Sequence, residues 1–549
     1  MPAHCLYNID IPDHLKRLIS CYQETERFLE AENLLKTKIR KSPNHGYLYV
    51  YLGYNFDRQQ QKELAKKNYE IALNSIDERP NYGGIIGRIF KDYNLLDNAV
   101  LAYQKTMAKN KNANYSFQIA QIYGEKGDFK KMFESYIDLV DKNISYYNLV
   151  QKYASRYITD DSENEANILF RKSLLRKSAS NPKDVWNVLL SWLFTQQKEY
   201  QKALVQEKAL YQRKPEDLAA IYSLGKIAFE NTAYDAAKLS FEFITQNSTL
   251  AEEKIDAHLY LTKIAIANNN AETEEIFQSL FKEFGKNTLT IKLQVEYADF
   301  LTFQQNKPEE AKQVLEKALT FSRSKFDKAS IKLKLGDILV FTGKYNKALI
   351  YFSQIQTQLK GSELAQQARF KVAQTSYFKG DFTWAKAQLK VLKGSTTQLI
   401  ANDAVELFLI ITDNEPVDSI PSGLIQYSKA ELLAFQNKTQ QAIDTLSFIN
   451  KNFKGQPIED EALYKQGKLY IKLKQFEKAI VNFEKVISLN PEGILIDDAH
   501  YELAELYHNH LNNPEKASEY YQKIIFDYSS SIYLVDARKK YRKLRGDTI

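Results

Sequence analysis

DEALYKQGKLYIKLKQFEKAIVNFEKVISLNPEG, residues 460–493, is a stretch of 34 residues in which small and aromatic side chains recur at helical spacing. Apolar residues return every three or four positions over 464–473 and again over 476–487, and this is the period of a helix rather than a strand. Pro491 ends the second run because proline lacks an amide hydrogen. The stretch therefore predicts two helices joined by a turn at 474–475.

The small residues indicate how these two helices meet. Gly467 in the first helix and Ala479 in the second allow a close approach, because small side chains let helix axes come together. The pattern resembles the tetratricopeptide repeat (TPR), which has glycine or alanine at place 8, an aromatic residue at 11, alanine at 20, an aromatic residue at 24, a small residue at 27 and proline at 32. Here these places hold Gly467, Tyr470, Ala479, Phe483, Val486 and Pro491, and only place 27 departs mildly.

The same pattern recurs in phase along the chain. Place 8 falls first at Ile19, Gly53, Gly87, Ala120 and Ala154, with spacings of 34, 34, 33 and 34 residues. It continues at Ser191, Gly225, a degenerate unit near Thr262, Ala298, Gly336, Ala373, Ala430, Gly467 and Ala504. The second-helix alanine at place 20 follows in nearly every unit, from Ala31 to Ala517. The resemblance implies an all-α fold, a TPR α-solenoid in which about fourteen helix-turn-helix repeats wind into a right-handed superhelix.

One insertion interrupts the series between Ala373 and Ala430, where the spacing rises to 57 residues. It holds an apolar helix at 404–411 and then TDNEPVDSIPSG, residues 412–423, whose prolines, glycine and acids are typical of a linker. We expect a long TPR superhelix over 1–411, a linker over 412–423 and a C-terminal TPR module over 424–549. The alternative is a long loop inside one continuous solenoid.

The charge balance of the chain argues against nucleic acid as its partner. The 75 basic and 68 acidic residues give a net charge of +7, too even a balance for a general nucleic-acid binder. The basic run at 536–547 is expected to be a solvated last helix, with an anionic partner or peripheral membrane association as the alternative.

No apolar stretch is long enough for a transmembrane helix, and MPAHCLYNID lacks the features of a signal peptide. The first repeat begins near Pro12 without a polar capping helix, so we expect the natural N-terminus to lie upstream.

The sequence contains no recognisable catalytic constellation. Phosphate-binding glycine loops, zinc-protease motifs and the serine-hydrolase elbow are all missing. Cys5 and Cys21 support neither a disulfide framework nor a metal site. In the histidine-rich stretch at 500–510, Glu505 and His508 lie one turn apart, but exposed polar residues at a repeat turn are the favoured interpretation. We therefore predict a non-enzymatic protein without cofactor or metal.

The TPR resemblance implies that the first helix of each repeat lines a concave groove, where places 2, 5, 9, 12 and 13 contact a peptide or protein ligand. Asparagine recurs at place 2, and its amide can donate to and accept from a peptide backbone. Helix capping is the alternative role for these asparagines. The lysine-rich clamp of chaperone-type TPR modules is not reproduced. The candidate partner-binding residues are Asn81, Arg88, Asn114, Gln121, Asn148, Trp192, Tyr222 and Lys226.

The C-terminal repeats carry a further resemblance. In the last 90 or so residues, helix PEKASEYYQKII leads to an aspartate, an aromatic residue, serines and a last helix that begins with alanine and basic residues. This order is similar to TPR modules of bacterial outer-membrane-assembly lipoproteins and of Tol-Pal-associated periplasmic proteins. It implies a scaffold of the bacterial cell envelope, in the periplasm. The alternative is a cytoplasmic regulatory or signalling TPR array without its output module. The residues that carry the likeness are Pro514, Tyr520, Tyr521, Asp527, Tyr528, Ser529, Ser530, Ala537 and Arg538.

Overall fold

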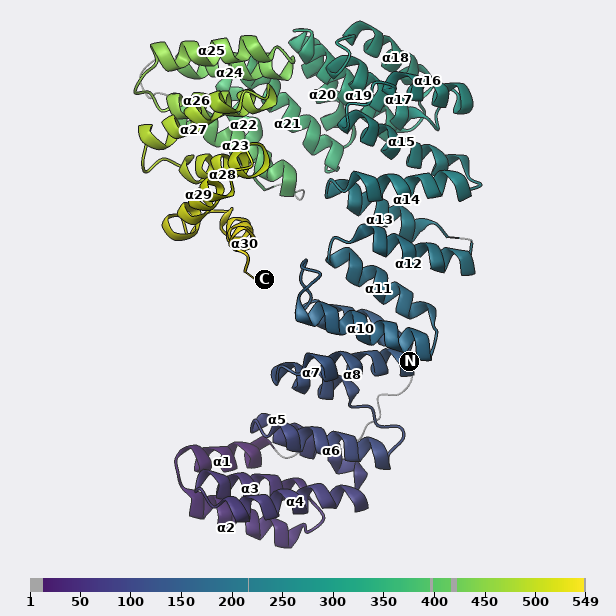
Figure 1. Ribbon diagram of the computed structural model, residues 1–549, viewed down its shortest axis with the longest axis vertical. Coiled ribbons are helices and arrows are strands. Elements are labelled where there is room, and N and C mark those ends of the chain that lie inside the picture. The colour runs from purple at the N-terminus through teal and green to yellow at the C-terminus, as the bar shows by residue number, and fades with distance from the viewer. Residues whose placement is uncertain (1–12, 216, 395–397, 416–421, 548–549) are drawn as a thin grey trace. The chain divides into compact units, whose positions relative to one another are not determined.

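The protein was analysed as a computed structural model that describes residues 13–215, 217–394, 398–415 and 422–547. These ranges form thirty α-helices and two short 3-10 helices, with no strand among them. Most helices follow one another as packed pairs, visible along the ribbon in Figure 1. The predicted all-α solenoid fold is therefore confirmed. Contacts divide the chain into two units, Met1–Ala236 and Ala237–Ile549, each of which is described by itself.

The first unit contains helices α1 to α13 and the start of α14. Their bounds are α1 (Asp13–Glu24), α2 (Phe28–Lys41), α3 (Tyr47–Arg58), α4 (Lys62–Glu78), η1 (Pro80–Tyr82), α5 (Gly83–Asp92), α6 (Leu96–Lys109), α7 (Ser116–Glu125), α8 (Phe129–Lys142), η2 (Ile144–Tyr146), α9 (Tyr147–Ala154), α10 (Glu165–Ser180), α11 (Asp184–Gln196), α12 (Tyr200–Arg213), α13 (Ala219–Glu230) and α14 (Tyr234–Asn247).

The second unit contains most of α14 and the helices α15 to α30. Their bounds are α15 (Ala251–Ala267), α16 (Thr273–Phe284), α17 (Ile291–Phe303), α18 (Pro308–Phe321), α19 (Lys325–Phe341), α20 (Tyr345–Gln358), α21 (Glu363–Phe378), α22 (Phe382–Leu392), α23 (Gln398–Asn414), α24 (Ser422–Phe435), α25 (Thr439–Asn452), α26 (Ile458–Lys472), α27 (Phe476–Leu489), α28 (Ile496–Asn509), α29 (Pro514–Asp527) and α30 (Leu534–Arg545).

The predicted repeat register agrees with the positions of the buried small residues. Every residue assigned to place 8, from Ile19 to Ala504, lies in the first helix of its repeat and is buried. Every residue assigned to place 20, from Ala31 to Ala517, is buried in the second helix. Among the described residues, the pairs that pack in this register begin at α1, α3, α5, α7, α11, α15, α17, α19, α21, α24, α26 and α28. Helix α9 packs against α8 instead.

The close contact inside a pair is made between place 8 and the aromatic ring at place 24. A Cβ atom added to Gly467 would lie 2.7 Å from the ring of Phe483, and one added to Gly336 would lie 2.3 Å from Phe352. Both distances are shorter than carbon atoms tolerate, so the ring rests directly on the glycine backbone. Glycine at place 8 thus permits a large aromatic side chain at place 24. The ring fills the space that a side chain at place 8 would take, so the core stays densely packed.

The turn inside a pair also has a common conformation. In every repeat but the one at Ala154, the seventh residue after place 8, or the eighth in two repeats, adopts the left-handed backbone region, which disfavours most side chains. Glycine fills this turn in three repeats, while asparagine and larger residues occupy the others. The repeats therefore share the backbone conformation of this turn but not its residue type. The residues concerned are Glu26, Gln60, Asn94, Gly127, Lys198, Thr232, Asn269, Asn306, Gly343, Gly380, Asn437, Lys474 and Asn512.

The insertion between the repeats at Ala373 and Ala430 forms helix α23. It packs against α22 and α21, as the first helix of a further repeat would, but the next helix, α24, already begins a new pair with α25. Helix α23 runs to Asn414 and α24 begins at Ser422, so both ends of the expected 412–423 linker are helical. Residues 416–421 lie outside the described part of the chain. The division of the chain at 412–423 stays a prediction.

Within the second unit, repeats far apart in sequence touch through phenylalanines at place 13. The ring of Phe303 at the end of α17 lies 5.4 Å from Phe341 of α19 and 5.3 Å from Phe435 of α24. Phe378 of α21 packs 6.0 Å from Phe435. These four residues, which we name the phenylalanine cluster, join first helices of four repeats, because edge-on and tilted rings pack favourably.

Two side-chain amides of the α24–α25 turn reinforce this junction. Gln436 donates to the carbonyl oxygen of Phe341 over 2.9 Å, and Asn437 donates to the carbonyl oxygen of Phe303. Carbonyls at a helix C-terminus have no partner within the helix. The α24–α25 turn therefore supplies donors to the ends of α17 and α19.

Candidate functional site

The predicted asparagine column lies at the N-terminal ends of three first helices in the first unit. Asn81 is in η1, Asn114 precedes α7, and Asn148 is in the first turn of α9; all three are exposed. The Oδ1 atom of Asn114 accepts from the backbone N–H of Ser116 over 3.2 Å, a local turn just before α7 in which asparagine is common. In the described part of the chain, no hydrogen bond engages the side chain of Asn81 or Asn148. The three asparagines thus differ in role.

The other five candidates also lie on first helices of the first unit. Arg88 on α5 is exposed, while Gln121 on α7, Trp192 on α11 and both Tyr222 and Lys226 on α13 are half-buried. Trp192 packs edge-on against the ring of Phe170 at 6.3 Å, and Phe170 belongs to the second helix of the preceding pair. Trp192 therefore contributes to the contact between repeats, while part of it stays open to solvent.

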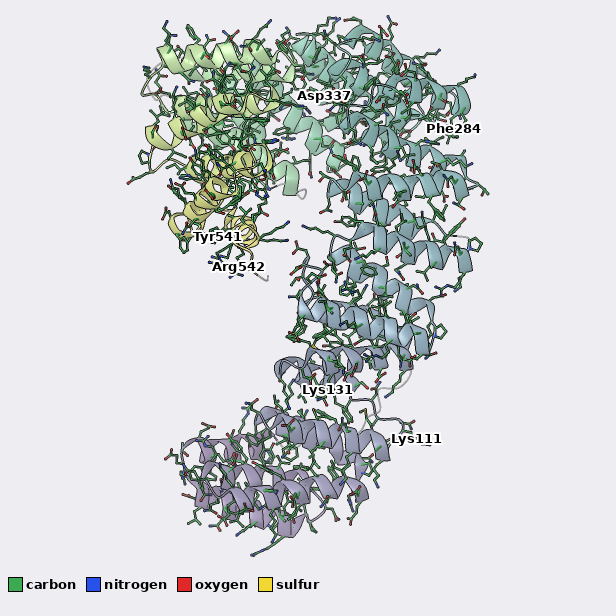
Figure 2. The ribbon with its side chains drawn as sticks, in the orientation of Figure 1. Lys111, Lys131, Phe284, Asp337, Tyr541 and Arg542 are labelled. Carbon is green, nitrogen blue, oxygen red and sulfur yellow. The ribbon has the colours of Figure 1, made fainter. Side chains whose placement is uncertain are left out.

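The second unit has a row of charged residues on its first helices that the sequence analysis missed. Lys371 of α21 pairs with Asp337 of α19 over 3.2 Å, and Lys465 of α26 pairs with Glu431 of α24 over 2.6 Å. Asp337, labelled in Figure 2, stands at place 9 of its repeat, as Glu431 does. The ion pairs thus connect the first helix of one repeat to the first helix of the next.

Lys334 is the most enclosed cation of this row. Burial lowers the pKa of its ammonium, but the carboxylates of Asp337 and Asp299 outweigh that effect, and the pKa lies above its ordinary value. The ammonium contacts Asp299 and lies 3.5 Å from Asp337. A sequence signal exists for this row, since lysine stands two residues before place 8 in K-L-G, K-V-A and K-Q-G at 334–336, 371–373 and 465–467.

A pocket of about 370 Å³ lies among α21, α23, α24 and α26. Its walls combine apolar and aromatic side chains with three carboxylates and one lysine, and we name it the acidic pocket. Two members of the phenylalanine cluster form part of the wall. The residues that line it are Phe370, Gln374, Tyr377, Phe378, Asp403, Glu406, Leu407, Ile410, Glu431, Ala434, Phe435 and Lys465.

The carboxylates of the acidic pocket are not equivalent. Glu431 accepts from the hydroxyl of Tyr377 over 2.9 Å and from the ammonium of Lys465 over 2.6 Å. Asp403 and Glu406 on α23 are exposed, and no hydrogen bond or ion pair engages either of them in the described ranges. Burial in the surrounding wall, followed by the charge of Glu431, raises the pKa of Glu406. The charge of Lys465 acts in the opposite direction on Glu406. The pocket therefore keeps two carboxylates that make no ion pair among the described residues.

The histidine-rich stretch at 500–510 does not gather around a common point. His500 is buried, and burial lowers its pKa to about 4. Glu505 accepts from Tyr521 and Lys540, while the ring of His510 stacks on Phe476 at 4.6 Å. Across the described residues, no group of three or more histidine, cysteine or acidic side chains is arranged to hold a metal ion. A search of the same residues finds no helix long and apolar enough to cross a membrane.

Comparison with known proteins places the repeat family in the C-terminal part of the chain. Residues 460–492 and residues 498–531 each match a family model described as tetratricopeptide repeat. These two segments are tetratricopeptide repeats by this comparison. The two matched segments coincide with the pairs α26–α27 and α28–α29, and the same register of buried residues extends through the other pairs.

Two solved structures show likenesses with low TM-scores. The structure of Naa15/Naa10 bound to HypK-THB is 11% identical with a TM-score of 0.28, and the match covers 97% of this chain and 96% of that chain. A tetratricopeptide repeat protein from Parabacteroides merdae is 18% identical with a TM-score of 0.26, and the match covers 53% of this chain and 98% of that chain. No curated protein matches the sequence. Likenesses at these TM-scores carry no argument about function.

Proposed function

We propose that the protein is a non-enzymatic scaffold that binds a peptide or protein partner along the first helices of its tetratricopeptide repeats. The observation that supports this proposal is the repeated packing of helix pairs within each unit, with buried residues at places 8 and 20. Because each repeat contacts mainly its neighbours, stacking leaves an extended surface of first-helix side chains open to a ligand. Exposed amides and cations on that surface, among them Asn81, Arg88 and Asn148, supply hydrogen bonds and charge.

Crosslinking in native cells, followed by pull-down of the full chain, tests the scaffold. We expect a protein partner whose crosslinks fall on first helices of the repeats. Crosslinks confined to second helices would contradict binding along the first helices, and failure to recover any protein partner would contradict a scaffold.

The asparagines allow a sharper test of the groove in the first unit. The double change Asn81→Ala and Asn148→Ala removes amides that have no intramolecular partner, so we expect weaker binding of the captured partner, by about 0.5 to 1.5 kcal/mol per site, and an unchanged melting temperature.

Asn114→Ala is the matched control, since the side chain of Asn114 already bonds to the backbone N–H of Ser116 in the turn before α7. Loss of that hydrogen bond is expected to lower the unfolding free energy by about 1 kcal/mol and to leave the affinity intact. Unaltered binding by the double variant would exclude these asparagines from the groove, leaving Arg88, Gln121, Trp192, Tyr222 and Lys226 as candidates.

We further propose that the scaffold acts in the bacterial cell envelope, on the likeness of the C-terminal repeats to envelope TPR modules. Fractionation of native cells with an antibody against the chain tests this location. Recovery in the periplasmic fraction is the expected result. Recovery in the cytoplasmic fraction would support the alternative, a regulatory or signalling TPR array that acts with a separate output module.

A further inference from the structure

The acidic pocket has the composition of a site for a long cationic side chain. Phe370, Leu407 and Ile410 offer an apolar wall, and Asp403 and Glu406 offer charge beside it. Lysine and arginine combine an aliphatic stem with a charged head, so they bury the stem along apolar surface and keep the head among polar groups. A purely apolar ligand would leave the two carboxylates without a partner.

Lys465 and Lys371, two cations near the pocket, form their ion pairs with acids other than Asp403 and Glu406, although the charge of Lys465 also acts on Glu406. Lys465 is bound to Glu431, which also receives the hydroxyl of Tyr377. Lys371, which lies over the ring of Phe435 at 5.9 Å, pairs with Asp337. Three carboxylates thus line the pocket with one ammonium, and the excess negative charge lies on α23.

Further acids beside the pocket increase the local negative potential. Burial raises the pKa of Glu461 on α26 to about 7, and the charges of Asp460, Glu431 and Glu406 add to this shift. Like charges held this close oppose each other's ionisation. A bound cation relieves that repulsion, and such electrostatic strain is characteristic of ligand-binding sites.

We propose that the acidic pocket binds a lysine or arginine side chain presented, beside an apolar residue, by a segment of a partner protein. The inference rests on the proposed scaffold function and names the chemistry of the partner at this one place. The charge complementarity selects a cationic segment, and the aromatic and aliphatic walls select a stem longer than that of a small inorganic cation. Helix α23, the insertion into the repeat series, contributes both free carboxylates, so the insertion creates the site.

A defined peptide tests the proposal with the full-length protein. The probe is fluorescein-labelled Gly-Leu-Arg-Leu-Arg-Leu-Gly amide, and its neutral counterpart carries citrulline in place of each arginine. Fluorescence anisotropy is expected to show that the arginine peptide binds more tightly than the citrulline peptide. The double change Asp403→Asn and Glu406→Gln is expected to weaken the arginine peptide about tenfold, since each exposed ion pair contributes up to about 1 kcal/mol.

The matched control is the double change Glu492→Gln and Glu515→Gln, which removes two exposed acids of the same unit outside the pocket. We expect the control to change the affinity less than about twofold. Equal weakening by both double variants would mean diffuse attraction and would overturn the proposal, as would equal binding of the citrulline peptide or no binding of the arginine peptide. Competition by spermine with the same dependence on Asp403 and Glu406 would overturn the partner-segment assignment in favour of a small polyamine.

Two measurements keep this proposal separate from the scaffold proposal. The pocket variant removes unpaired charges, so its melting temperature is expected to equal or exceed that of the unmodified protein, which excludes misfolding as the cause of lost binding. A partner recovered by crosslinking that binds the pocket variant and the unmodified chain equally would end the pocket proposal and leave the scaffold standing.

Discussion

Glycine at place 8 and an aromatic ring at place 24 form the recurring residue contact of this protein. The repeats at Gly53 and Gly336 show it as clearly as the repeat at Gly467, with rings at Tyr69, Phe352 and Phe483 where a Cβ atom would otherwise lie. The ring covers backbone that would otherwise be solvated, and the glycine leaves the ring the space it needs. One missing side chain thus determines how closely two helices approach.

Gly467→Leu is expected to destabilise the C-terminal repeats by about 1 to 3 kcal/mol, because the leucine must displace the ring of Phe483. Chemical denaturation followed by circular dichroism measures the loss. The double variant Gly467→Leu with Phe483→Ala makes room for the leucine, so the two changes should be strongly non-additive. An unchanged midpoint for Gly467→Leu alone would place Gly467 outside the helix contact.

The protonation of Glu461 makes the stability of the protein depend on pH. Its pKa is about 7 in the folded chain against 4.5 for the free side chain, so the folded state holds the proton more tightly than the unfolded state. Stability contributed by this group is therefore full below about pH 4.5 and falls as the pH rises through about 7. The charged groups that surround it in the fold, largest effect first, are Asp460, Glu431, Glu406 and Asp498.

The variant Glu461→Gln tests this sign. We expect it to be more stable than the unmodified protein at about pH 8, by about 1 kcal/mol after allowance for solvent screening, and equally stable below about pH 4.5. Urea titrations at the two pH values measure the difference. Glu492→Gln is the control and should show no such dependence. A stabilisation independent of pH would contradict an electrostatic origin.

At the scale of elements, the second unit is held together by more than contacts between neighbouring repeats. The phenylalanine cluster joins α17, α19, α21 and α24, and the amides of the α24–α25 turn bind the ends of α17 and α19. A repeat array is ordinarily stabilised by nearest-neighbour interfaces. The α17–α24 contact adds a connection between repeats more than a hundred residues apart.

Phe435→Ala is expected to weaken this connection. Removing the ring takes away packing against Phe303 and Phe378, and because Phe435 is half-buried the loss should be about 2 kcal/mol, below the value for a fully buried ring. Hydrogen exchange should accelerate at the C-terminal end of α17 as well as in α24. Phe448→Ala on α25 is the control, since Phe448 is 49% exposed and its ring packs 6.1 Å from that of Phe453, outside the phenylalanine cluster. Unchanged exchange in α17 would show that the cluster contributes no stability.

At the scale of the whole molecule, stability is distributed along the chain rather than gathered in one core. Damage in one repeat should loosen its neighbours first. The contacts divide the chain at Ala236 and Ala237, whereas composition predicts a boundary at 412–423, where proline, glycine and acids accumulate.

Limited proteolysis compares these two boundaries. From the linker composition we expect the first cut between Thr412 and Gly423, giving a large N-terminal and a small C-terminal fragment. N-terminal sequencing and mass measurement of the fragments identify the site. First cleavage near residue 236 instead, with 412–423 resistant, would remove the boundary predicted from composition.

The sequence by itself determined the repeat register of this protein. Place 8 and place 20 could be assigned from Ile19 to Ala517. Helix pairing needs small residues at a fixed spacing, and this spacing can be recognised in the sequence alone. A turn was predicted at 474–475, but the left-handed backbone conformation of the turns was not, since residues as different as Lys198 and Thr232 adopt it. There the surrounding helix pair imposes the backbone conformation.

Only the tertiary structure decided where residues of distant repeats meet. Phe303 and Phe435 stand at the same place of repeats far apart in sequence, and nothing in either repeat records their contact. The sequence predicted only an apolar helix at 404–411 and did not single out Asp403 or Glu406, which line a pocket because α23 lies beside α21, α24 and α26. The physical reason is that small rotations between successive repeats accumulate along a solenoid, so its long-range contacts depend on the sum of many interfaces rather than on any one stretch of sequence.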